Sequence, residues 1–173
     1  MNRKETTKFL GDLLVSDRLT GLGKYWAREV SIDYGTKDVR RVDFMQFEPA
    51  GVTSVTCYEI KSCKEDVFSG KGLNFIGEKN YIVTTMQCWK DIQEDYRNGR
   101  LAEHIINCNP ESSLHYGVMV AIPYYVEEND EYESPTLLDS SEKWKLKIIL
   151  PCILGLRKKN LTEMLFYMLR SGH

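Results

Sequence analysis

The run from Ser54 to Lys61 constrains the fold of this chain more than any other segment. Its β-branched and aromatic residues predict a strand. Because successive side chains on a strand point to opposite faces, Glu59 and Lys61 then share one face. A carboxylate and an amine in mid-strand cost free energy unless something pairs with them. Asp43 lies in a second strand-like run, 41–47, so two acids and a lysine on adjacent strands indicate a metal site.

Hydrophobic spacing and turn-forming clusters predict an α/β order for the rest of the chain. An N-terminal helix ends before the glycines at 21 and 23. The predicted strands are 28–34, 41–47, 54–61, 81–84 and 116–122. A helical turn and a glycine-rich basic loop are expected within 64–80, and helices at 85–97, 101–106 and 161–170. Thr84 or Thr85 is expected to cap the helix that follows it. The acidic stretch 127–133 is expected to be an exposed loop without a chemical role.

The composition bounds the class of protein. A chain of 173 residues with 42% hydrophobic and 28% charged residues is typical of one globular domain, here 1–173. No apolar run is long enough to span a bilayer, and the first residues are too polar for a signal peptide. We therefore expect a cytoplasmic protein without membrane contact. The net charge of −2 provides no general basic field, so any binding of phosphates depends on a local patch.

Several common kinds of site are poorly supported. The five cysteines are odd in number and form no C-x-x-C pair, which predicts free thiols in a reducing compartment. The histidines lack zinc-ligand spacing and a nearby nucleophile. The loop around Lys71 has glycines on both sides of the lysine, but the phosphate-loop spacing of nucleotide triphosphatases is missing.

With Val42-Asp43 on one predicted strand and Glu59-Ile60-Lys61 on the next, the chain resembles the PD-(D/E)XK nuclease superfamily. Arg40-Arg41 and the nearby Glu65-Asp66 make it similar to small bacterial and phage proteins of that superfamily, some described as DNA-repair-like. The resemblance covers about residues 28–84. It implies a restriction-endonuclease-like αβββαβ core, with a central mixed sheet flanked by helices and the acids on the second and third strands.

The resemblance also implies roles for individual residues. Asp43 and Glu59 would bind Mg²⁺, for which Mn²⁺ can substitute, and Lys61 would orient or deprotonate the attacking water. Glu29 would be a third metal ligand, with a solvated surface position as the alternative and Glu5 as a weaker candidate. Lys61 also has a structural alternative, an ion pair with one of the two acids. The residues expected to contact substrate phosphates are Ser62, Lys64, Lys71 and Lys79.

These observations favour a Mg²⁺-dependent deoxyribonuclease that hydrolyses phosphodiester bonds with a metal-activated water. The alternative is a non-catalytic nucleic-acid-binding or protein-interaction module that retains the nuclease fold. A third reading is an unrelated α+β protein in which the Glu-x-Lys element is accidental. Many nucleases of this kind act as dimers, because a duplex has two strands to cut, so a homodimer is compatible with the resemblance, although no segment marks an interface.

Overall fold

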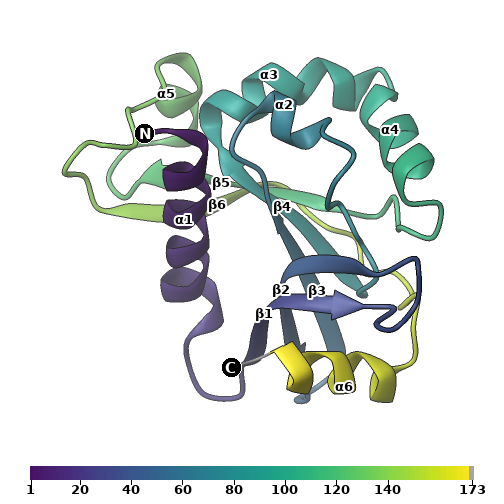
Figure 1. The fold of residues 1–173 in the computed structure, drawn as a ribbon. Helices are drawn as coiled ribbons and strands as arrows, with labels where there is room; N and C mark the ends of the chain where they lie inside the picture. The colour runs from purple at the N-terminus through teal and green to yellow at the C-terminus, as the bar shows by residue number, and fades with distance from the viewer. Residues whose placement is uncertain (172–173) are drawn as a thin grey trace.

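The computed structural model of the protein describes residues 1–171. Its centre is one six-stranded sheet whose strands lie side by side in chain order, from β1 to β6. Strands β1, β2 and β3 form an antiparallel meander, β4 and β5 run parallel to β3, and β6 returns antiparallel to β5. The α/β class and the mixed sheet flanked by helices are as predicted (Figure 1).

The elements follow the predicted order closely in the first half of the chain. The strands are β1 (Tyr25–Ile32), β2 (Arg40–Glu48), β3 (Ser54–Ile60), β4 (Lys79–Thr85), β5 (Gly117–Pro123) and β6 (Trp144–Leu150). The helices are α1 (Arg3–Leu14), α2 (Lys64–Val67), α3 (Met86–Arg97), α4 (Arg100–Cys108), α5 (Glu128–Glu133) and α6 (Leu161–Ser171). A π-helical turn, η1 (Val15–Leu19), continues α1.

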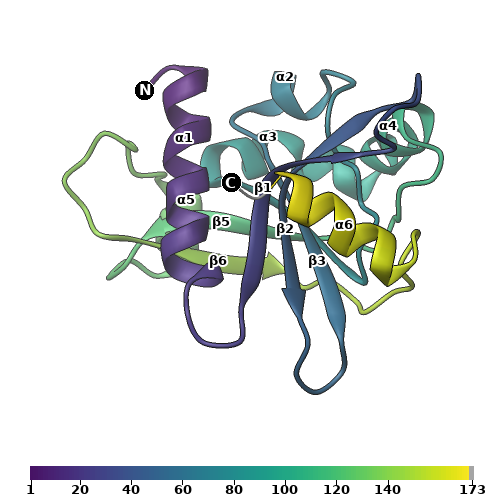
Figure 2. The same ribbon diagram turned by 60° about the horizontal axis from the view of Figure 1, so that its bottom comes forward.

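The two faces of the sheet are covered by different helices. Tyr58 and Ile60 of β3 pack with Leu10 and Leu14 of α1, on one face. The other face divides in two, because α6 covers the β1–β3 part while α3 and α4 cover β4 and β5. Figure 2 shows α1 and α6 over different parts of the sheet. Residue 59 of β3 therefore faces the region between the α6 cluster and the α3–α4 cluster.

Polar caps fix where two of these helices begin. At α1, the Asn2 side chain accepts a hydrogen bond from the Glu5 N–H at 3.0 Å, and the Glu5 carboxylate accepts one from the Asn2 N–H at 2.8 Å. This reciprocal capping box satisfies two otherwise unpaired donors. At α3, the Thr85 hydroxyl accepts from the Cys88 N–H at 3.0 Å, which confirms the predicted capping role of Thr85.

The second half of the chain corrects two expectations. Residues 128–133 form the short helix α5 rather than an exposed loop, and Glu131 within it is only 1% exposed. Its carboxylate accepts hydrogen bonds from the N–H and hydroxyl of Thr136, both at 2.8 Å, which compensates its burial. Strand β6 was not predicted, although Trp144, Leu146 and Ile148 alternate with lysines as on a half-buried strand.

Two further expectations concerned free cysteine thiols and the lack of a membrane-spanning segment. The five cysteines, all within the described range, are free thiols. Burial raises the pKa of Cys57 and of Cys88 to about 12, so both remain neutral thiols. No helix within residues 1–171 is both long enough and apolar enough to cross a membrane.

Strands β1 and β2 contain a break in alternation. Residues three apart on a regular strand point to opposite faces, yet Ala27 and Val30 pack into the same cluster, as do Val42 and Met45. The break coincides with Glu29, whose φ of 52° is left-handed. The register of β1 against β2 places Glu29 opposite Asp43. A left-handed backbone is strained for any residue with a Cβ. This kink therefore lies directly beside the acid of β2.

The substitution Glu29→Gly should stabilise the protein, because glycine adopts a left-handed backbone without steric cost. We expect the free energy of unfolding to exceed that of Glu29→Ala by about 1 kcal/mol in urea denaturation. The alanine variant is the matched control, since both changes remove the carboxylate and its exposed ion pair with Arg41. Equal stabilities of the two variants would show that the kink stores no strain.

Candidate active site

The candidate site begins where β2 and β3 stop pairing. The last paired residues at this end are Phe44 and Tyr58, and the register places Asp43 opposite Glu59 at the next position. There the Asp43 carboxylate accepts a hydrogen bond from the Ile60 N–H at 2.8 Å. A side-chain oxygen thus takes the place of a main-chain acceptor at the end of the ladder. This bond holds Asp43 beside the Glu59-Ile60-Lys61 element.

The Glu59 carboxylate is buried, and the partly buried Asp43 carboxylate is near enough for its charge to act on Glu59. Glu59 is 1% exposed, and one carboxylate oxygen accepts a hydrogen bond from the Asn74 N–H at 3.1 Å. Burial raises the pKa of Glu59 to about 8, and the charge of Asp43 adds to the shift, while Lys61 and the N–H groups of Leu73 and Asn74 oppose it. Burial also raises the pKa of Asp43, against the opposing hydrogen bond from Ile60. The two acids therefore cannot both ionise here without compensation by a positive charge.

Lys61 supplies a cation next to these acids. It is 4% exposed, and its ammonium donates a hydrogen bond to the Lys71 carbonyl at 2.7 Å. Its main chain continues the parallel pairing with β4, since the Lys61 N–H donates to the Val83 carbonyl at 3.0 Å. The Lys61 carbonyl accepts from the Thr84 hydroxyl at 2.5 Å. Both main-chain bonds fix the point from which the side chain enters the site.

Asp66 of α2 is an acid to which sequence reasoning gave no role. It accepts hydrogen bonds from the Ser62 N–H and hydroxyl, both at 3.0 Å, and forms ion pairs with Arg3 and, at 3.9 Å, with Lys61. Burial alone would raise the pKa of Asp66, but the bonds from Ser62 and the charge of Lys61 lower it below its ordinary value. The sequence pattern that could have identified Asp66 is an acid in the first turn of the helix that follows the Glu-x-Lys element. Asp66 thereby connects Lys61 to the N-terminus of α1.

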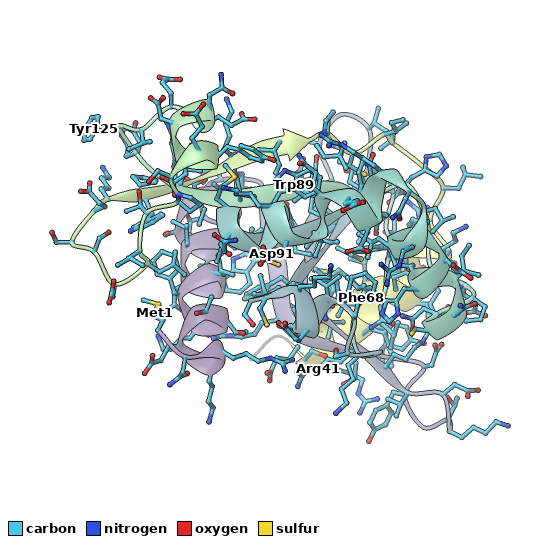
Figure 3. The ribbon with its side chains drawn as sticks, turned by 90° about the horizontal axis from the view of Figure 1, so that it is seen from above. Met1, Arg41, Phe68, Trp89, Asp91 and Tyr125 are labelled. Carbon is cyan, nitrogen blue, oxygen red and sulfur yellow. The ribbon has the colours of Figure 1, made fainter. Side chains whose placement is uncertain are left out.

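These residues line one pocket of about 520 Å³. Asp43, Glu59, Lys61 and Asp66 contribute its charged groups, together with basic side chains from three elements. The basic residues are Arg3 of α1, Arg40 and Arg41 of β2, and Lys71 of the loop after α2. In Figure 3, Arg41 lies on the same side of the molecule as α2, far from Tyr125. The pocket thus combines the buried Glu59 and the partly buried Asp43 with cations of which Arg3, Arg41 and Lys71 are exposed.

The predicted residues do not all meet in this pocket. Asp43, Glu59, Lys61 and Lys71 line it, whereas Glu29, Ser62, Lys64 and Lys79 are not among the described residues that do. The Glu29 side chain is 66% exposed and lies 3.5 Å from Arg41. The hydroxyl of Ser62 is bonded to Asp66, and Lys64 forms an ion pair with Asp95 at 2.7 Å.

Lys79 lies at the start of β4, where it pairs with Thr56. Because β3 and β4 run parallel, Lys79 lies level with a residue three positions before Glu59. It is therefore near the start of these strands, whereas the pocket is near the end of β3. The basic surface at the pocket therefore comes mainly from arginines of α1 and β2, and Lys71 is the one predicted lysine contact that belongs to it.

The donor set of the pocket fits a hard divalent cation. Mg²⁺ is bound in proteins by one or two carboxylates and further oxygens, and Asp43 and Glu59 are such a pair. The side-chain oxygen of Asn74, which lines the same pocket, is buried and has no hydrogen-bond partner in the described part of the chain. No group of three or more His, Cys, Asp or Glu suited to a metal occurs within residues 1–171. A third oxygen must therefore come from another type of residue or from solvent.

The loop after α2 lies directly against the charged pair. A Cβ placed on Gly72 would lie 2.6 Å from a carboxylate oxygen of Glu59 and 2.9 Å from the ammonium of Lys61. Gly72 also has a left-handed φ of 74°. The absence of a side chain at this position is therefore required by both the backbone and the close approach.

Comparisons of the chain with protein-family models, with curated proteins and with solved structures found no match. Function is therefore inferred from the chemistry of the pocket itself. The convergence of Asp43, Glu59 and Lys61 is the feature that limits which chemistry this pocket can perform.

Gly72→Ala should destabilise the protein more than Gly70→Ala. Both glycines have a left-handed φ, but a Cβ on Gly70 meets only the Cys108 sulfur, at 3.8 Å. The two variants share the backbone cost, and Gly72→Ala adds the displacement of Glu59 and Lys61. We expect an extra loss of about 1–3 kcal/mol in the free energy of unfolding, measured by denaturant titration. Equal losses would mean that the loop does not press on the charged pair.

The stability of the metal-free protein should fall as the pH rises from about 5 to 8. The folded state keeps a proton on Glu59 up to a pKa of about 8, whereas the unfolded chain releases it near 4.5. The folded state thus binds more protons across this window, and raising the pH favours unfolding. We expect wild type to lose stability, on the order of a few kcal/mol, relative to Glu59→Gln.

Urea denaturation in EDTA at several pH values provides the measurement. Groups other than the coupled acids titrate alike in both proteins, so the difference between wild type and Glu59→Gln isolates the pocket. Parallel stability curves for the two proteins would contradict the raised pKa of Glu59.

Proposed function

We propose that this protein is a Mg²⁺-dependent deoxyribonuclease that hydrolyses phosphodiester bonds. The observation that carries the proposal is that Asp43 of β2 lies in one pocket with Glu59 of β3 and with Lys61, which directly follows β3. The hydrogen bond from the Ile60 N–H holds Asp43 there. Two carboxylates and a lysine in one pocket match the needs of metal-assisted hydrolysis.

We infer further that the fold is of the restriction-endonuclease-like type. A helix precedes three antiparallel strands, and the next strand is parallel to the third. This arrangement resembles the αβββαβ core of the PD-(D/E)XK superfamily, with the acids on the second and third strands. The helix expected between the third and fourth strands is represented by the single turn α2. The resemblance supports the chemistry, but fold alone does not fix it.

Each charged residue of the pocket has a different role in the proposed hydrolysis. Asp43 and Glu59 would hold the divalent ion, and the ion's charge would allow both carboxylates to ionise in a buried site. A bound Mg²⁺ supplies a nucleophile from water near neutral pH and neutralises charge on the phosphate oxygens. Lys61, fixed by the Lys71 carbonyl, places a positive charge beside the scissile phosphate and orients the attacking water. Asp66 forms a second contact with Lys61, an ion pair at 3.9 Å.

The exposed cations of the pocket support DNA as the partner. The Arg3 and Arg41 side chains are more than half exposed, and Lys71 is exposed. These groups provide a local basic surface in a protein of net charge −2, and guanidinium groups bind phosphate oxygens well. Because few cations contribute, affinity for DNA should be modest and should fall with added salt.

One observation favours the non-catalytic alternative. The ammonium of Lys61 is engaged by the Lys71 carbonyl, and Gly72 lies against the Glu59 carboxylate. A loop held this closely would suit a module in which the charged pair serves only to stabilise the fold. The two functions differ in whether a scissile phosphate reaches Lys61.

Cleavage of single-stranded, double-stranded and branched DNA by wild type and three variants tests the proposal. Asp43→Asn, Glu59→Gln and Lys61→Ala should each lower the Mg²⁺-dependent rate by at least about 100-fold, because each removes an interaction made with the reacting phosphate or its metal. DNA affinity, measured by fluorescence anisotropy in Ca²⁺, should change much less. Glu65→Gln is the matched control, since Glu65 is an exposed acid of α2.

The outcomes separate the two functions. Loss of cleavage in the three variants, with Glu65→Gln active, supports the nuclease. DNA binding by a wild-type protein that never cleaves any substrate in Mg²⁺ or Mn²⁺ supports the binding module instead.

A further inference from the structure

Asn74 holds a buried oxygen that the rest of the protein leaves unused. Its side chain is 2% exposed and lines the same pocket as Asp43 and Glu59. Within residues 1–171, Oδ1 of Asn74 has no hydrogen-bond partner. Buried carbonyl oxygens are nearly always paired, so an unpaired one at a candidate site requires an explanation. Two other buried side-chain oxygens in the described residues lack a hydrogen bond, on Asp95 and Ser140, and neither residue lines this pocket. The Asp95 oxygen is in addition 2.7 Å from the Lys64 ammonium, in an ion pair.

The orientation of the Asn74 amide is determined by its neighbours. Nδ2 donates a hydrogen bond to the Arg41 carbonyl at 2.8 Å. Turning the amide over would place two oxygens against each other, so Oδ1 is the atom left free. The main-chain N–H of Asn74 donates to Glu59 at 3.1 Å. Asn74 therefore joins β2 to the acid of β3.

The backbone around Asn74 is held rigidly, and at a cost. Leu73 has a left-handed φ of 58°, which is unusual for a bulky residue. The Ser112 hydroxyl donates to the Leu73 carbonyl and accepts from the Phe75 N–H, both at 2.8 Å. Both chain neighbours of Asn74 are thus tied to one serine. A strained backbone fixed in this way is typical of a positioned functional group.

We infer that Oδ1 of Asn74 is the third protein oxygen that binds the divalent cation, beside Asp43 and Glu59. This inference rests on the proposed function. The third acid that lines the pocket, Asp66, is already bonded to Ser62 and paired with Arg3. Glu29 lies outside the pocket, and no group of three or more His, Cys, Asp or Glu suited to a metal occurs within the described residues. An amide oxygen is a suitable hard ligand, and binding would satisfy the acceptor that the fold leaves unpaired.

Binding of Mn²⁺, measured by titration with electron paramagnetic resonance in the absence of DNA, tests the inference. Asn74→Ala removes the oxygen and should weaken Mn²⁺ binding by about tenfold or more. Asn74→Asp keeps an oxygen and adds a charge, so it should bind Mn²⁺ within about threefold of wild type or more tightly. Urea denaturation of each variant shows that it is folded.

Asn109→Ala is the matched control for loosening of the loop. Asn109 is a buried asparagine whose side-chain N–H donates to the Gly72 carbonyl at 2.9 Å, and its oxygen is not among the fully buried, unpaired ones of the described chain. Asn109 also lines the pocket, but it is not one of the proposed ligands. Its removal should therefore leave Mn²⁺ affinity within about threefold of wild type.

The results distinguish this inference from the proposed function. Wild-type binding that is lost in Asp43→Asn but unchanged in Asn74→Ala overturns the role of Asn74 alone. Equal weakening in Asn74→Ala, Asn74→Asp and Asn109→Ala also overturns it, because loop anchoring then explains the effect. If wild type binds no Mn²⁺, or binds it as well after Asp43→Asn, the metal site itself is wrong and the inference falls with it. Should Asn74→Ala fail to fold, weaker binding by folded Asn74→Asp contradicts the inference by itself.

Discussion

The hydrogen bond from the Ile60 N–H to the Asp43 carboxylate is the interaction on which the site depends. It forms where the pairing of β2 with β3 ends, so one contact both satisfies a main-chain N–H of β3 and positions an acid. Without it, a buried N–H would lack a partner and Asp43 would be free to turn toward solvent. Glu59 and Lys61, on either side of Ile60, share the rigidity of the paired strand. The geometry of the pocket is therefore a consequence of strand pairing rather than of a flexible loop.

The pocket concentrates charges that do not balance in the absence of a cation. Two carboxylates lie in a buried region with raised pKa values, and Lys61 compensates only part of their charge. Lys61 also forms an ion pair with Asp66, as Arg3 does, and the pKa of Asp66 is lowered. At neutral pH Asp66 is therefore ionised, whereas Glu59, with a pKa of about 8, keeps its proton when no cation is bound. A divalent ion between Asp43 and Glu59 would replace that proton by a stronger charge.

The sequence predicted the strands and their acids well, because a period of two is a local signal. The predicted strands contain Asp43 of β2 and Glu59 of β3, and Lys61 directly follows β3. Glu29 does not line the pocket because a left-handed residue interrupts the alternation of β1, and no local pattern announces that kink. Asp66 and Asn74 come from the connection after β3, whose path depends on distant partners such as Ser112. Single-chain periodicity carries no information about such contacts.

Backbone strain is not spread evenly through this fold. Two of the three non-glycine residues with positive φ in the described chain lie next to residues that line the pocket: Glu29 is opposite Asp43, and Leu73 precedes Asn74. Each holds its neighbour in a position that relaxed strand or loop geometry would not provide. Left-handed strain, buried acids and an unpaired amide oxygen all reduce stability, and they occur together around one pocket. Such a concentration of unfavourable features at one place is expected where binding, rather than folding, determines the residues.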